Sequence, residues 1–470
     1  SYASQGHVIL SSPTGSGKTE TALLWLKHQL DVKGDGRVFY VLPYTASINA
    51  MYERLNEQFG AETHNVGMLH GKLAQYLEER FADETGPDSS TTDNVQLMQD
   101  FRTLVTPLKI VTPFQLLKHI FGVKGFEKGI AEWSGGYFIF DEIHAYDSRT
   151  FAQIVVLLEF CTRQLGVKVF IMTATLPSFM RIKIQEALGD SSLIKADASL
   201  YDAFDRHQLV IEPGKLIDSA GQIQADLDTG AKVLVVCNTV EQAQAIYSCL
   251  HAESKLLIHG SFNAEDRSRK EARLHEEEVQ LLVGTQAIEV SLDIDYDTIY
   301  TEPAPLDALI QRFGRVNRKR KKGICLCHVF LENNEKDKYI YNQEVVKRTL
   351  NVLTTDVMEK CGGLIHEKDL QSLIDKVYPY WEEKQRKEYE DTYQNLSQGI
   401  LYELSPLTYS EHREKDYYDL FDGVKVLPSS LCERYQHYFE QQRFVKAESL
   451  LVSIRESRMY ALLKEDGIDR

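Results

Sequence analysis

Residues 12–19 read Ser-Pro-Thr-Gly-Ser-Gly-Lys-Thr and stand between an apolar run at residues 7–10 and a helical pattern at residues 20–30. A strand, a glycine-containing loop and a helix in this order are typical of a phosphate-binding loop, because glycines let backbone N–H groups curl around phosphate oxygens. Lys18 would reach the β and γ phosphates, and the Thr19 hydroxyl would bind Mg²⁺. The expected nucleotide-binding residues of this loop are Thr14, Gly15, Ser16, Gly17, Lys18 and Thr19.

Position 12 departs from the general pattern, because Ser12 stands where that pattern has a glycine. The strict motif therefore fails by one residue. The context of strand, loop and helix is nevertheless kept, and it favours a phosphate-binding role over a purely structural glycine-rich turn.

A second stretch supplies the carboxylates that such a site needs. Residues 137–144 read Tyr-Phe-Ile-Phe-Asp-Glu-Ile-His, an apolar strand followed by two acidic residues. Asp141 is expected to hold Mg²⁺, and Glu142 to polarise the attacking water as a general base beside the metal. Together with the phosphate loop, these residues predict a site that hydrolyses ATP with Mg²⁺.

Short apolar runs alternate with helical patterns through the first two thirds of the chain, which predicts parallel sheets covered on both faces. In the first part the expected strands are residues 38–42, 109–111, 137–140 and 168–172. In the second part they are residues 209–211, 233–236, 256–258, 281–283 and 298–300. The acidic, turn-rich stretch 82–95 is expected to be a surface insertion.

The 470 residues therefore divide into three expected domains. Residues 1–203 and 204–338 form two α/β domains in tandem. Residues 339–470 change to long charged helical patterns with many aromatic residues, and they predict a linker helix and a smaller, mainly helical domain.

Composition narrows the class of protein. Hydrophobic residues make up 43% and charged residues 26% of the chain, as in folded proteins, and no apolar run approaches the roughly 18–20 residues of a membrane span. The seven scattered cysteines indicate a reducing cytoplasm rather than a disulfide framework. The net charge of −16 argues against bulk nucleic-acid binding, but seven of the eleven residues from 312 to 322 are Arg or Lys.

That basic run belongs to residues 309–318, Leu-Ile-Gln-Arg-Phe-Gly-Arg-Val-Asn-Arg. Phosphoryl transfer needs positive charge on the developing γ-phosphate, commonly from arginines. Arg315 and Arg318 are three residues apart and would lie on one helix face, so they are predicted to be catalytic together with Gln311 and Glu142.

In chain order these motifs are PTGSGKT, DEIH, residues 173–175 (Thr-Ala-Thr), 283–286 (Val-Gly-Thr-Gln) and QRFGRVNR. The chain resembles the superfamily 2 helicases of the DExH type. The DEIHAYD form, the stretch TQAIEVSLDID at 285–295 and Gln311 narrow the resemblance to the helicase part of the CRISPR-associated helicase–nuclease of type I systems. The resemblance implies two tandem RecA-like domains, and an ATP-dependent translocase moving 3′ to 5′ on single-stranded DNA after recruitment by an RNA-guided surveillance complex.

The resemblance also implies roles for further residues. Asp293 would touch the nucleotide ribose or the interdomain cleft. Thr173 and Thr175 would link the γ-phosphate to domain closure. The expected contacts to the single strand are Pro43, Thr45, Thr112, Pro113, Asn238, Thr239, His259, Gly260, Thr285 and Gln286.

Two departures from the family pattern affect the expected partners. The adenine-reading motif would lie upstream of residue 7, where it cannot be placed. None of the fourteen histidines is followed by Asp, so the family's His-Asp nuclease is expected in a separate or removed polypeptide.

Two alternatives stay open. A superfamily 2 RNA helicase or remodeller would use the same chemistry on a different polymer, and no sequence feature reports contacts to the ribose 2′-OH. A non-catalytic scaffold regulated by ATP is the other alternative, and the intact set of ATPase residues argues against it.

Overall fold

The computed structural model describes residues 6–59, 65–73, 76, 101, 106–276, 278–289, 292–419, 423–454 and 456–464. The predicted insertion at 82–95 lies outside the described residues. Contacts divide the chain into two compact units. Unit 1 comprises Ser1–Ala196 and Tyr380–Asp422, and unit 2 comprises Asp197–Pro379 and Gly423–Arg470.

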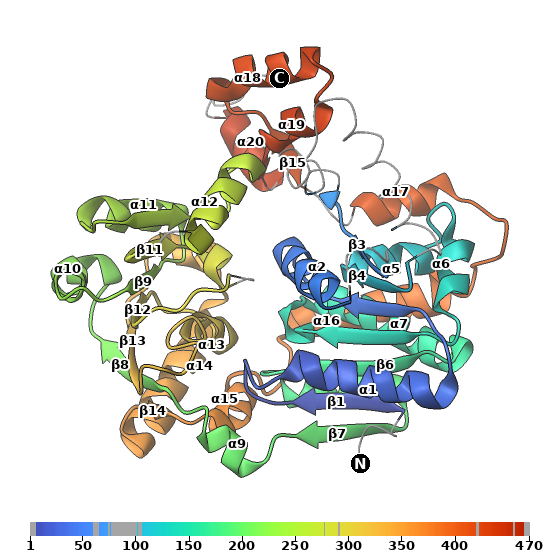
Figure 1. Cartoon of the computed structure of the whole chain (residues 1–470), viewed down its shortest axis with the longest axis horizontal. Coiled ribbons are helices and arrows are strands. Elements are labelled where there is room, and N and C mark those ends of the chain that lie inside the picture. Colours follow the sequence, from blue (N-terminus) through green and yellow to red (C-terminus); the bar gives the residue numbers. More distant parts are fainter. Residues whose placement is uncertain are drawn as a thin grey trace. The chain divides into compact units, whose positions relative to one another are not determined.

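Unit 1 is built on a parallel sheet, as the sequence predicts. In the described residues its seven strands have the order β3-β4-β2-β5-β6-β1-β7 (Figure 1). The strands are β1 (His7–Ser11), β2 (Val38–Val41), β3 (Val66–Leu69), β4 (Leu108–Val111), β5 (Tyr137–Asp141), β6 (Lys168–Thr173) and β7 (Ser191–Lys195).

Both faces of this sheet are covered, which is why its strands are apolar on both sides. Helices α1 (Lys18–Lys33) and α2 (Thr45–Phe59) bury one face, and Val8 and Leu10 of β1 point into that core. The other face, with Ile9, is buried by α5 (Pro113–Ile120), α6 (Phe126–Trp133), α7 (Ser148–Leu165) and α8 (Ser178–Leu188).

Unit 2 repeats the plan. Its described residues form a seven-stranded sheet in the order β10-β11-β9-β12-β13-β8-β14, parallel except for β14. The strands are β8 (His207–Glu212), β9 (Val233–Val236), β10 (Lys255–Ile258), β11 (Leu281–Gly284), β12 (Thr298–Thr301), β13 (Cys325–Phe330) and β14 (Leu364–Ile365). The predicted strands of both α/β domains are thus confirmed.

Helices cover both faces of the second sheet as well. One face packs against α10 (Ala220–Asp228) and α11 (Val240–Cys249), and the other against α13 (Leu306–Phe313), α14 (Gln343–Val352) and α15 (Leu370–Val377). The remaining elements of unit 2 are α9 (Ala198–Asp202), α12 (Ala264–Glu276), β15 (Val424–Val426), α18 (Cys432–Glu440), α19 (Phe444–Ser449), β16 (Val452–Ile454) and α20 (Glu456–Lys464).

The C-terminal region is mainly helical, as predicted, but it is divided between the two units instead of forming one domain from residue 339 to 470. Its aromatic residues explain the division. Trp381 and Tyr389 stack on each other and contact Phe151 of α7, and Tyr417 belongs to the same core. Helices α16 (Glu383–Gln394) and α17 (Glu411–Asp419) therefore complete the core of unit 1. None of the helices in the described residues is long and apolar enough to cross a membrane.

Candidate functional site

The phosphate loop lies between β1 and α1. Gly15 (φ 84°) and Gly17 (φ 87°) both adopt left-handed backbone conformations, which favour glycine, and α1 begins directly afterwards at Lys18. The Lys18 Nζ donates to the carbonyl oxygens of Ser12 (3.3 Å) and Pro13 (3.5 Å). The Lys18 ammonium is thus folded back across the loop that precedes it.

Ser12 takes part in the loop's own structure. Its hydroxyl lies 2.9 Å from that of Ser16, so the two side chains are hydrogen-bonded across the turn. The residue that departs from the general pattern is thereby accommodated by the loop.

The two residues predicted to hold Mg²⁺ lie close together, through a residue that the sequence did not single out. The hydroxyl of Tyr40, on β2, donates to Asp141 Oδ2 (3.2 Å) and is hydrogen-bonded to the Thr19 side chain. The Asp141 Oδ1 accepts from the backbone N–H of Glu142 (2.9 Å). Thr19, Tyr40 and Asp141 therefore form one polar cluster.

Electrostatics at Asp141 suit a cation. Burial and the neighbouring Glu142 raise the pKa of Asp141 to about 6, whereas Lys18 opposes this rise. A divalent cation beside the carboxylate would favour its ionised form. Mg²⁺ is usually held by one or two protein oxygens together with phosphate and water, so Thr19 and Asp141 fit that ion.

The loop after β5 carries Glu142 in a strained conformation. Glu142 has φ 51° and ψ 40°, in the left-handed region that non-glycine residues rarely adopt. A short 3₁₀ turn follows at Ile143–Ala145. Such strain is common at functional sites.

The predicted coupling residues lie in the same place because of the strand order. Strand β6 lies between β5 and β1, so its carboxyl end, Thr173, lies between the acidic loop and the phosphate loop. The Thr173 hydroxyl lies 3.2 Å from His144 Nδ1 and accepts from the backbone N–H of Thr175 (3.3 Å). Thr173 is thus hydrogen-bonded to the acidic motif through His144.

The predicted catalytic arginines of unit 2 do not lie on one helix face, because α13 ends at Phe313 and both arginines follow it. They contact their own unit. Arg315 donates to three backbone oxygens, those of Ile288 (3.2 Å), Leu292 (2.9 Å) and Glu289 (2.5 Å). Arg318 forms an ion pair with Asp293 (3.0 Å). Both guanidinium groups thus bind the segment that follows β11, and their role toward phosphate stays a prediction.

Arg312 forms the centre of a second polar cluster. It lies on α13 beside Gln311 and its side chain is 0% exposed. It forms an ion pair with Glu289 Oε1 (2.8 Å) and donates to the Tyr341 hydroxyl (3.0 Å). Its other partners are Thr301 Oγ1 (2.7 Å), Glu302 O (3.2 Å) and Asn238 Oδ1 (3.3 Å). All five guanidinium N–H groups are thereby used.

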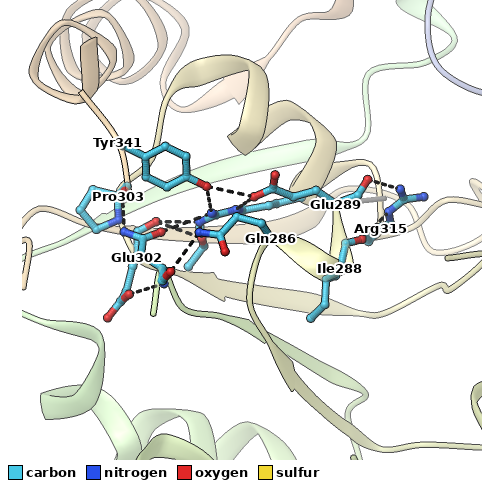
Figure 2. Close-up of polar contacts among 10 residues, drawn as sticks. Gln286, Ile288, Glu289, Glu302, Pro303, Arg315 and Tyr341 are labelled. Atoms are coloured by element: carbon cyan, nitrogen blue, oxygen red, sulfur yellow. Dashed lines mark hydrogen bonds and ion pairs between the residues drawn. The ribbon is translucent and has the colours of Figure 1, made fainter. Parts of the chain in front are cut away.

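Two buried acids extend this cluster. Glu302 accepts from Asn238 N (2.6 Å) and Asn334 Nδ2 (2.6 Å), and Asp337 accepts from Asn238 Nδ2 (3.1 Å). Burial raises the pKa of Glu302 to about 7, with a further contribution from Asp337. Figure 2 shows the Tyr341 hydroxyl beside the Glu289 carboxylate, with Gln286 and Glu302 drawn among the same polar contacts.

The residues predicted to grip a single strand gather at sheet edges. In unit 1, Pro43 follows β2 and Thr45 begins α2, while Thr112 precedes Pro113, the first residue of α5 after β4. In unit 2 the predicted contacts follow the neighbouring strands β9, β11 and β10. They are Asn238, Thr239, Thr285, Gln286, His259 and Gly260.

Some of these side chains have internal roles. Asn238 is 1% exposed and its amide is fully engaged in the Arg312 cluster. Thr239 caps α11 by accepting from Gln242 N (3.3 Å). His259 stacks on Phe262 with ring centres 4.0 Å apart. The backbone N–H of Asn238 also donates to Glu302, and its backbone oxygen accepts from Gln286. Contact of these residues with nucleic acid stays a prediction.

Comparison with known families agrees with both halves of the motif set. Residues 1–182 match the DEAD/DEAH box helicase family, and residues 229–321 match the C-terminal family of the CRISPR-associated nuclease/helicase Cas3. The chain is therefore similar to DEAD/DEAH box helicases in its first part and to Cas3 in its second part. This confirms the resemblance predicted from the motifs.

Individual relatives agree. The CRISPR-associated nuclease/helicase Cas3 of Methanothermobacter thermautotrophicus is 28% identical over 466 residues, covering 93% of this chain and 53% of that protein. The chain thus spans about half the length of this Cas3 relative. The crystal structure of T. fusca Cas3-ATP has a TM-score of 0.67 at 20% identity and covers 87% of this chain and 56% of its own. A CRISPR RNA-guided surveillance complex, pre-nicking, gives 0.61 at 18% identity, with 86% and 53% covered. Both structures confirm the predicted fold.

Sequence reasoning missed residues that the structure makes central. Tyr40 lies in an apolar run, where a tyrosine is expected to pack in the hydrophobic core. The neighbouring residues therefore do not predict its hydrogen bond to Asp141. Arg312 stands inside the quoted arginine motif, but its burial depends on Glu289 and Tyr341, which are distant in sequence. A polar residue inside an otherwise apolar helix face was the only available signal for Arg312.

Proposed function

We propose that the chain hydrolyses ATP with Mg²⁺ and uses this reaction to move along single-stranded DNA in a type I CRISPR interference system. The observation that carries the proposal is the polar cluster of Thr19, Tyr40 and Asp141 beside Lys18 at the carboxyl edge of the first sheet. In open parallel α/β sheets, ligands bind at this edge.

Each residue of the cluster has a distinct task. Thr14–Thr19 would bind the phosphates through backbone N–H groups, with the Lys18 ammonium turning from its carbonyl partners to the β and γ phosphates. Thr19 and Asp141 would hold Mg²⁺, which neutralises phosphate charge. Glu142 would accept the proton of the attacking water. Thr173 and Thr175 would report the presence of the γ-phosphate through His144.

In unit 2, Arg315 and Arg318 with Gln311 would stabilise charge on the transferred phosphoryl group. To do so, Arg318 exchanges Asp293 for phosphate, which leaves Asp293 available to the ribose. The strand contacts at the two sheet edges would bind the DNA backbone and not the bases, as a translocating motor requires.

The further parts of the proposal are supported by the relatives. Cas3 proteins are named as nuclease/helicases, and one structural match is a surveillance complex. We therefore infer recruitment by an RNA-guided complex and cleavage by a nuclease supplied in trans or on another segment. From the resemblance of the motifs we further infer that this nuclease is of the His-Asp type, that movement is 3′ to 5′, and that the chain acts in the cytoplasm.

The test is steady-state ATP hydrolysis with Mg²⁺, alone and with single-stranded DNA, single-stranded RNA or duplex DNA of equal length. We expect strong stimulation by single-stranded DNA, abolished in Lys18→Ala. Equal or greater stimulation by RNA would instead assign the chain as an RNA helicase. An absence of hydrolysis under every condition would overturn the motor and favour an ATP-regulated scaffold.

A further inference from the structure

The Arg312 cluster joins four separate segments of unit 2. These are the loop after β9, the segment after β11, the end of β12 and the stretch that precedes α14. The last contributes Tyr341, which belongs to none of the helicase motifs. The Tyr341 hydroxyl accepts from Arg312 Nη2 (3.0 Å) and donates to Glu289 Oε1 (3.4 Å). Figure 2 shows this hydroxyl pointing to the Glu289 carboxylate.

Burial of a full ion pair is costly, so the cluster is not explained by stability alone. Replacing a buried pair by apolar residues is often neutral or stabilising, and polar cores can instead specify one arrangement of their segments. Here Arg312 is 0% exposed and Glu289 is largely buried. The arrangement that they specify is the position of α13 relative to the segment after β11.

Glu289 connects this arrangement to the arginines. Its carboxylate binds Arg312 and Tyr341, while its backbone oxygen accepts from Arg315 Nη2. A shift of Glu289 therefore moves a direct partner of Arg315. On the other side of the cluster, Asn238 binds Arg312 through Oδ1 and Gln286 through its backbone oxygen (3.0 Å). The same hydrogen bonds thus reach two of the predicted strand-binding loops.

We propose that Tyr341 is a positioning residue. Through Arg312 and Glu289 it fixes the position of Arg315 relative to the loops that carry Asn238 and Gln286. This inference rests on the proposed function, because it assigns Arg315 to the hydrolysis step. Removal of the Tyr341 hydroxyl leaves a buried Arg312 N–H group without that acceptor and loosens Glu289. ATP binding by the phosphate loop of unit 1 does not depend on this hydroxyl, so the effect falls on turnover.

The experiment compares Tyr341→Phe with Tyr339→Phe, a matched control whose side chain is 71% exposed in the same segment. ATPase kinetics are measured with saturating single-stranded DNA. We expect Tyr341→Phe to lower kcat about tenfold while KM for ATP changes less than about twofold, the signature of a lost transition-state interaction. Tyr339→Phe should match the parent chain in both parameters.

A double-mutant cycle tests whether Tyr341 acts through Arg315. In an Arg315→Lys background, Tyr341→Phe should lower kcat by less than about twofold, because groups that act together are not additive. Thermal unfolding of each variant shows whether the fold is kept. If Tyr341→Phe lowers only the unfolding midpoint and leaves kcat unchanged, or if the two substitutions multiply, the inference fails. An inactive parent chain would instead overturn the proposed function.

Discussion

Each unit has a polar cluster at the carboxyl edge of its parallel sheet. The two clusters differ in the hydrogen bonds and ion pairs that the protein itself supplies to their side chains. In unit 1, burial and Glu142 raise the pKa of Asp141, whereas Lys18 lowers it. Glu142 itself adopts a strained backbone conformation. In unit 2, Arg312 uses every donor it has on its own unit. We proposed the first cluster as the site for nucleotide and metal, whereas the contacts of the second cluster join segments of the chain.

This difference predicts opposite consequences of substitution. Changes in the unit 1 cluster should remove chemistry and leave the fold intact, because the replaced side chains are proposed to act on nucleotide and metal. Changes in the unit 2 cluster should cost stability as well, because each partner that is removed leaves another buried group unpaired.

The largest expected effect is on turnover by the unit 1 cluster. Lys18→Ala and Glu142→Gln should each lower kcat by about 10²–10⁴-fold, the usual contribution of a general base or of charge stabilisation. Single-strand binding should persist, and the unfolding free energy should change by less than about 1 kcal/mol. Lys27→Ala, on the same helix and 70% exposed, is the control. Near-normal ATPase in Glu142→Gln would remove Glu142 from the general-base role.

The next effect is on stability and belongs to unit 2. Arg312→Met keeps much of the side-chain volume but leaves Glu289 buried without its cation, so we expect unfolding to become easier by about 3–5 kcal/mol. Urea titration followed by circular dichroism measures this change. Arg269→Met, which removes an ion pair from an arginine 61% exposed, should cost less than about 1 kcal/mol. Equal costs at the two positions would show that the cluster does not stabilise unit 2.

Glu302 adds a pH dependence to unit 2. Its ordinary pKa of 4.5 rises to about 7 in the folded chain, so between these values the folded state retains a proton that the unfolded state releases. Stability therefore falls as pH rises from about 4.5 to 7, by about 3 kcal/mol at most from this group. The charged neighbours Asp337 and Arg312 act on Glu302 in opposite directions.

Glu302→Gln should flatten this fall, measured as unfolding free energy against pH relative to the parent chain. We expect the variant to be offset by a constant amount, because both Glu302 oxygens accept hydrogen bonds and a Gln side chain accepts with only one oxygen. The slope is the decisive quantity. An unchanged slope would show that Glu302 ionises near its ordinary pKa in the folded chain.

The alternation of short apolar strands with helices was enough to predict both sheets, because parallel strands are buried on both faces and leave few other arrangements. The phosphate loop and the acidic pair could likewise be located from the sequence, since each is a run of adjacent residues that follows a predicted strand. The Arg312 cluster was not readable, because Asn238, Glu302 and Tyr341 are brought together by the fold alone. The division of the C-terminal region was missed for the same reason, since Trp381 and Tyr389 gave no sign of which core they join.

The smallest expected effect concerns Tyr40, which is hydrogen-bonded to both residues proposed to hold Mg²⁺. Its hydrogen bond to Asp141 lowers the pKa of that carboxyl, so Tyr40→Phe should raise the pKa further above about 6. Asp141 would then be protonated at a higher pH, and the acidic limb of the kcat/KM profile should shift upward. Losing one hydrogen bond to a charged group should lower kcat/KM at neutral pH by about tenfold, and more Mg²⁺ should partly restore it.

Tyr137→Phe is the matched control, because its hydroxyl lies in the same sheet but contacts the backbone oxygens of Gln29 and Gly34, away from Asp141. Its acidic limb should coincide with that of the parent chain. If both variants shift the limb equally, the shift arises from loosening of the sheet and Tyr40 has no special link to the metal. A shift confined to Tyr40→Phe would assign the acidic limb to Asp141. Asp141 would then be the group whose ionised form the metal is proposed to stabilise.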